Sequence, residues 1–106
     1  MTSAQPYQEF QVTITVSPSL EEILVDWLLD FGSDRDFISF PVSSHSSDHQ
    51  GLFSLAEQVA GRQKRLRFQI AIRAEELAHF IERLKQDFHG TGLHYRVAPY
   101  VASGQL

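Results

Sequence analysis

Two runs in which large apolar residues occupy every second position constrain the fold of this chain most strongly. The first run, residues 9–16, is rich in β-branched side chains, and its apolar positions are Phe10, Val12, Ile14 and Val16. The second run, residues 65–72, has the apolar positions Leu66, Phe68, Ile70 and Ile72. Because successive side chains of a strand point to opposite faces of its sheet, each run predicts a strand with one buried face. The other face of the second strand is basic, since it carries Arg65, Arg67 and Gln69.

Two further segments repeat their apolar residues at helical spacing. The first begins with Ser17-Pro18, a capping residue followed by a proline at a first helical position, and it ends before Gly32. Its apolar stripe is Leu20, Ile23, Leu24, Trp27, Leu28 and Phe31. The second segment ends in residues 89–92 and has the stripe Leu77, Phe80, Ile81, Leu84 and Phe88. Both patterns indicate amphipathic helices that pack on a sheet, and the first predicts a helix of about four turns.

Two shorter runs complete the set of strands. Asp36 to Val42 reads as a strand, and its Pro41 suits a sheet edge or a strand end because proline lacks the backbone N–H that a ladder needs. Leu93 to Val101 reads as the last strand. Alternation places Leu93, Tyr95 and Val97 on one of its faces and His94 and Arg96 on the other.

The order strand, helix, strand, strand, helix, strand predicts an α+β fold, the ferredoxin-like βαββαβ sandwich. Its sheet has four antiparallel strands, both helices lie on one face, and a long loop joins strands 2 and 3. We expect one domain over residues 1–106, with an ordered core over about 9–101. The first and third strands would be central, so the open face would hold Thr13, Thr15, Arg65, Arg67, Gln69, His94 and Arg96. Because this face is polar and basic, we expect it to be buried against another copy of the chain.

Composition excludes several classes of function. The chain contains no cysteine, which rules out disulfides, cysteine nucleophiles and thiolate zinc sites. The five histidines form no nucleophile–base–acid pattern, and no glycine-rich phosphate loop, HExxH or GxSxG occurs, so we expect no enzyme. The sequence has neither a signal-peptide pattern nor a run of about 18 apolar residues. We therefore expect a cytoplasmic protein that does not insert into a membrane.

Charge is divided unevenly along the chain. Residues 1–60 hold nine acids and one base, whereas residues 61–106 hold eight bases and four acids. This division favours a local anion site or electrostatic pairing between subunits, and it argues against general attraction to nucleic acid. A basic run, Arg62, Lys64, Arg65 and Arg67, is the candidate anion site, because guanidinium groups match phosphate and carboxylate oxygens in pairs. The alternative is a strand that forms ion pairs between subunits.

The polar segment 43–64 is too long for an ordinary connection, since loops beyond about 12 to 15 residues are usually functional or disordered. His45, Asp48 and His49 could supply two imidazoles and a carboxylate to a divalent metal such as zinc or copper. The alternative is a pair of solvated loop histidines. Residues 54–57 form a capping box for a short helix that ends at Gly61, so we expect 55–60 to be ordered and 43–51 to be mobile.

The segment 54–65 together with Leu66-Arg67-Phe68-Gln69 is similar to the hallmark of a bacterial PII-like family, domain of unknown function 3240, within the wider PII and divalent-cation-tolerance superfamily. Members of that family often accompany heavy-metal efflux systems. The resemblance implies a homotrimer, ligand clefts between subunits and a loop that contacts a target. The chain departs from PII proteins in two places. Residues 61–64 resemble a piece of the PII loop, but they adjoin the third strand instead of lying at the tip of the loop. The glycine-rich nucleotide-binding turn expected before the last strand is reduced to residues 90–92.

From these observations we expect a regulatory or sensing module that binds a small ligand, with a divalent metal favoured. It would signal through residues 43–64 to a membrane transporter, such as an efflux or metal-resistance system. The alternative is an anion or nucleotide sensor that uses the Arg62–Arg67 strand. An RNA-binding sheet is a weaker alternative, because the third strand lacks the aromatic residues on which such sheets stack bases.

Overall fold

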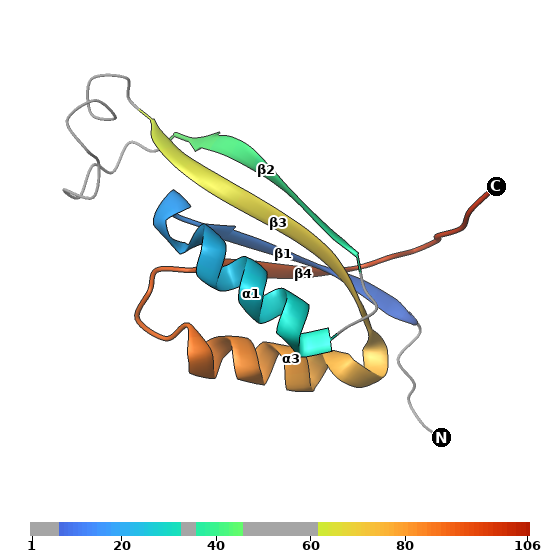
Figure 1. Cartoon of the computed structure of the whole chain (residues 1–106). Coiled ribbons are helices and arrows are strands. Elements are labelled where there is room, and N and C mark those ends of the chain that lie inside the picture. Colours follow the sequence, from blue (N-terminus) through green and yellow to red (C-terminus); the bar gives the residue numbers. More distant parts are fainter. Residues whose placement is uncertain (1–6, 33–35, 46–61) are drawn as a thin grey trace.

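The computed structural model describes residues 7–32, 36–45 and 62–106 (Figure 1). Its strands are β1 (Glu9–Val16), β2 (Phe37–Ser44), β3 (Gln63–Arg73) and β4 (His94–Pro99), and its helices are α1 (Glu21–Gly32) and α3 (Ala74–Asp87). The strands form one antiparallel sheet in the order β2-β3-β1-β4. Figure 1 shows both helices against one face of this sheet and the other face open. The predicted α+β ferredoxin-like sandwich is therefore confirmed.

The central strands follow their sequence pattern closely. β1 has the bounds that alternation predicts, and every second residue from Phe10 to Val16 is buried under the helices. β3 begins two residues earlier than Arg65, because Gln63 and Lys64 pair with Ser44 and Ser43 of β2. β2 is an edge strand, as expected for a strand that contains Pro41.

The first helix begins differently from the prediction. A short 3-10 turn, η1 (Pro18–Leu20), precedes α1, and the Leu20 N–H donates to the Ser17 carbonyl at 3.0 Å. Ser17 caps no backbone N–H with its side chain, because its hydroxyl bonds the Ser19 hydroxyl at 2.8 Å. The tighter turn replaces the first turn of the predicted α-helix.

The last strand is shorter than the predicted Leu93 to Val101. The Tyr100 N–H still donates to the Glu9 carbonyl at 3.0 Å, but β1 begins at Glu9 and offers no partner beyond it. The residues after Tyr100 therefore extend away from the body of the protein (Figure 1). At the other end of β4, Gly90 and Gly92 adopt φ values of 81° and 83°, which residues with a Cβ rarely adopt.

The core lies between the sheet and the two helices. Its buried members are Val12, Ile14, Val16, Leu24, Leu28, Phe68, Ile70, Ile72, Phe80, Leu84 and Phe88. An aromatic cluster joins the helices: the ring of Phe80 meets the rings of Trp27 and Phe31 edge-on, with centroids 5.3 and 5.0 Å apart. The core therefore uses the apolar face of each strand and leaves the polar face of the sheet uncovered.

Candidate functional site

A hollow of about 430 Å³ lies on the open face of the sheet. Its lining residues come from all four strands and from the turn before β4. They are Thr13, Thr15, Ser44, Arg65, Arg67, Gly92, His94 and Arg96. Because these residues are far apart in sequence, the sheet itself assembles the hollow.

Strand register determines which side chains meet there. Thr15 of β1 is paired with Arg67 of β3 on one side and with His94 of β4 on the other. Thr13 is paired with Arg96 two residues further along. Neighbours in one row of a sheet have Cβ atoms about 4.5 to 5.5 Å apart, so the Thr15 hydroxyl lies between the basic groups of Arg67 and His94, while Thr13 has one basic neighbour, Arg96.

Two of the arginines are held by hydrogen bonds. Arg67 donates from Nε to the Thr15 hydroxyl at 3.1 Å. Arg65 donates to Oε1 of the buried Gln63 at 2.7 Å and to the Lys64 carbonyl at 2.9 Å. Both side chains are half-buried, so their guanidinium groups are positioned before any ligand arrives. His94 and Arg96 are exposed at the β4 side of the hollow.

The hollow is cationic. Three guanidinium groups and one imidazole line it, together with three hydroxyls, and no carboxylate lines it among the residues that the structure describes. Arginine and hydroxyl donors around one space match the oxygens of a phosphate or a carboxylate. The chemistry that this geometry favours is the binding of a small anion.

The predicted basic run is divided between the two faces. Arg65 and Arg67 line the hollow. Lys64 also lies in β3, but one residue out of phase with them, so it belongs to the opposite face of the sheet. Arg62 precedes the strand and is exposed outside the hollow. Arg96 joins them instead, although it was not among the candidate site residues. The sequence did indicate its position, because the alternation of residues in the last strand places Arg96 on the open face.

The predicted metal ligands are only partly described. His45 is exposed and directly follows Ser44, which lines the hollow. Asp48 and His49 lie outside the described residues, as do the capping box 54–57 and most of the segment 43–64. Within 7–32, 36–45 and 62–106, no group of three histidine or acidic side chains is placed to hold a metal ion. Metal binding stays a prediction.

No helix in the described part of the chain is long and apolar enough to cross a membrane. Comparison with the curated proteins found no match. Comparison with solved structures found proteins of the same fold.

A DUF3240 family protein from Shewanella baltica is 18% identical, with a TM-score of 0.70 over 93% of this chain and 97% of that one. A protein from Thermus thermophilus described as PII-like signalling is 16% identical, with a TM-score of 0.59 over 89% and 88% of the two chains. Bacillus subtilis GlnK, solved in complex with ATP, is 18% identical, with a TM-score of 0.54 over 89% and 85%. At these identities the likeness establishes the fold. The model of the family described as protein of unknown function, DUF3240, matches residues 7–106, and the chain belongs to that family.

Proposed function

We propose that this protein is a PII-like regulatory module, not an enzyme, that binds a small anion on its open sheet face. The observation that carries the proposal is the convergence of Arg65, Arg67 and Arg96 with His94 in one hollow whose described lining contains no carboxylate. Charge-assisted hydrogen bonds from arginine are among the strongest that a protein can offer an anion. The solved complex of the similar GlnK with ATP, a phosphate-bearing molecule, supports phosphate as the group to test first.

The signal would leave through the segment 43–64. β2 ends at Ser44, which lines the hollow, and β3 begins at Gln63, which accepts a hydrogen bond from Arg65. The segment between them therefore leaves from the edge of the hollow and returns to it. An anion bound by Ser44 and Arg65 would act on both ends of the segment at once. We expect the target to be a transport or metal-resistance system.

The proposed assembly is a homotrimer with the open faces turned inward. Apart from its basic residues, that face carries Ile38 of β2, whose side chain is 59% exposed, and register places Phe40 beside Arg67. Covering this apolar edge favours association, and an anion between the subunits would offset the repulsion among their arginines. Light scattering should report three times the monomer mass, and a monomer at micromolar concentration would contradict the trimer.

A divalent metal is the second proposed ligand, held by His45, Asp48 and His49. Its support is the position of His45 directly after the hollow-lining Ser44, together with ligand types that suit zinc and copper. A metal bound there would act on the same segment. The two ligand classes are separable, because they need different side chains.

Calorimetric titration with phosphate, pyrophosphate and ATP tests the anion proposal. Each neutralising variant, Arg67→Gln and Arg96→Gln, should weaken binding about 10- to 100-fold, which corresponds to losing one hydrogen bond to a charged group. Lys64→Gln is the matched control, because it removes the same charge from the same strand but from the other face. If Lys64→Gln weakens binding as much as Arg67→Gln, or if none of the three anions binds, the proposal is wrong.

A further inference from the structure

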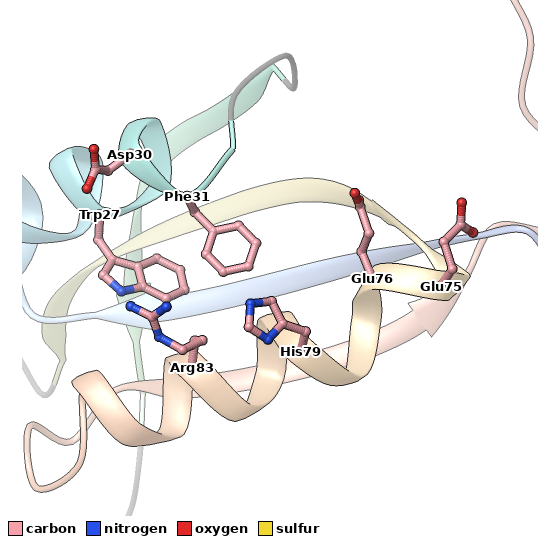
Figure 2. A pocket seen from close by; sticks show the side chains of 7 residues that line it. All are labelled: Trp27, Asp30, Phe31, Glu75, Glu76, His79 and Arg83. Carbon is pink, nitrogen blue, oxygen red and sulfur yellow. The ribbon is translucent and has the colours of Figure 1, made fainter.

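A second surface of the protein has the opposite charge and lies on the helices. A groove of about 470 Å³ runs between α1 and α3 (Figure 2). Figure 2 shows the rings of Trp27, Phe31 and His79 facing the space between the two helices, with the Arg83 guanidinium beside Trp27 and with Glu75 and Glu76 at the first turn of α3. Asp30 lies at the α1 rim. Neither the charge division of the sequence nor the anion proposal accounts for this groove.

The aromatic wall of the groove is fixed by its surroundings. Trp27 stacks on Phe31 with centroids 5.2 Å apart, and Phe31 lies 5.6 Å from the His79 ring. Behind Trp27, the rings of Phe80 and Phe88 pack edge-on, and the indole N–H donates to Asp87 at 2.8 Å. These contacts hold the indole in one orientation. The groove thus presents a prepared aromatic surface, which attracts cations through the negative face of its rings.

The carboxylates at and beside the groove divide into engaged and unpaired groups. Asp87 is bonded by Trp27 and Arg83, and Glu76 lies 4.0 Å from Arg73. Asp30 and Glu75 have no ion-pair partner within the described ranges of the chain. The two helices together carry eight carboxylates and two basic residues. The surface is therefore complementary to a positively charged ligand.

Exposed apolar side chains continue the groove along the outer surface of α1. Ile23 and Leu29 are 59% and 62% exposed, and they line a shallow hollow with Asp26, Trp27 and Asp30. Trp27 and Asp30 belong to both hollows, so the two are continuous. A small organic cation would fill only the aromatic part, whereas a longer ligand with alternating basic and apolar groups would use the whole surface.

We propose that this continuous surface docks a basic amphipathic segment of a partner polypeptide. A lysine or arginine of the segment lies over Trp27 and pairs with Asp30 or Glu75, while its apolar side chains cover Ile23 and Leu29. This proposal is independent of the anion site, because it uses the opposite face of the sheet-helix core (Figure 1).

Fluorescence titration tests the proposal directly, since Trp27 is the only tryptophan of the chain. The probe is a tryptophan-free peptide of about four helical turns, with lysine on one face and leucine on the other, added to the full chain. A saturable change in Trp27 emission is expected. Asp30→Asn/Glu75→Gln should weaken binding about three- to tenfold, because exposed ion pairs contribute modestly. Leu29→Ser should also weaken it.

The matched control is Glu21→Gln/Glu82→Gln, which removes two carboxylates from the same helices outside both hollows. Equal weakening by the control, or equal binding of a sequence-scrambled peptide, would reduce the effect to general attraction and overturn the proposal. If the protein binds free arginine as tightly as the peptide, its ligand is a small cation and not a polypeptide segment. If Asp30→Asn/Glu75→Gln instead lowers the mass of the peptide-free protein in sedimentation, a second copy occupies the surface and the proposal is wrong.

Discussion

Replacing Phe80 should test the packing on which both helices depend. Its side chain is fully buried, at 0% exposure, between the sheet and the rings of Trp27 and Phe31. Truncating a buried phenylalanine to alanine costs about 3 to 5 kcal/mol, as lost burial and as a cavity. The free energy of unfolding of a small domain is only about 5 to 15 kcal/mol. Phe80→Ala should therefore remove a large part of the stability of this protein.

A second variant separates the aromatic contacts from burial. Phe80→Leu keeps an apolar side chain but loses two edge-on ring contacts, each worth about 0.5 to 1.5 kcal/mol, so it should cost about 1 to 3 kcal/mol. Urea denaturation followed by Trp27 fluorescence and by circular dichroism measures both losses. All variants are compared at one protein concentration, because association would stabilise the folded state.

The exposed Glu82 on the same helix provides the control, and Glu82→Ala should change stability by no more than about 0.5 kcal/mol. If Phe80→Ala costs no more than Glu82→Ala, the ring cluster between α1 and α3 is not packed as described. The α1–α3 groove would then lose its fixed aromatic wall as well.

Three further outcomes follow from particular residues. Gly92→Ala should lower the free energy of unfolding by about 1 to 2 kcal/mol, because Gly92 has a positive φ that a residue with a Cβ rarely adopts. Crowding adds nothing, since a Cβ there meets no atom within 4 Å. The control is Gly104→Ala, which is equally uncrowded but has no positive φ and should cost nothing measurable by urea denaturation. The indole N–H of Trp27, and then Arg83, lower the pKa of Asp87 below its ordinary value. The Asp87 carboxylate therefore stabilises the fold above about pH 4 and loses this effect as the pH falls further. Asp87→Asn should flatten that part of the stability profile; an unchanged profile would refute the assignment. Zinc or copper bound by His45 and His49 should be released in acid, because a protonated imidazole cannot bind a metal, and equal metal affinities for the wild type and His45→Ala/His49→Ala would rule those ligands out.

The strands could be predicted because their pattern is local. In β1 every second residue is buried, and this period of two is visible in eight consecutive residues without knowledge of any partner strand. The composition of the open face followed from the same reasoning, because the βαββαβ order fixes which strands are central. The ends of the strands were less predictable, because they depend on the neighbouring strand. β3 begins early because β2 still provides residues for it to pair with, and β4 ends where β1 provides no further pairing residues.

The candidate site was only half predictable for a related reason. A run of basic residues in one segment reads as one cluster, but alternation separates Lys64 from Arg65 and Arg67, and register then brings Arg96 to them from β4. The groove between the helices gave no signal of this kind. In the sequence, Trp27 and Phe31 belong to an apolar stripe, and only the packing of α1 against α3 leaves one side of their rings accessible beside His79.

The two surfaces can hold opposite charges because the core separates them. A helix with its side chains is about 10 to 12 Å across, whereas charges in physiological salt are screened over about 8 Å. The carboxylates on the outer side of α1 and α3 therefore do little to neutralise Arg65, Arg67 and Arg96 on the far side of the sheet. Because the surfaces share no side chain and no hydrogen bond between them is found among the described residues, an anion and a basic segment should bind with free energies that add. Any coupling between them would have to come from a change of structure that both ligands favour, not from direct attraction between their charges.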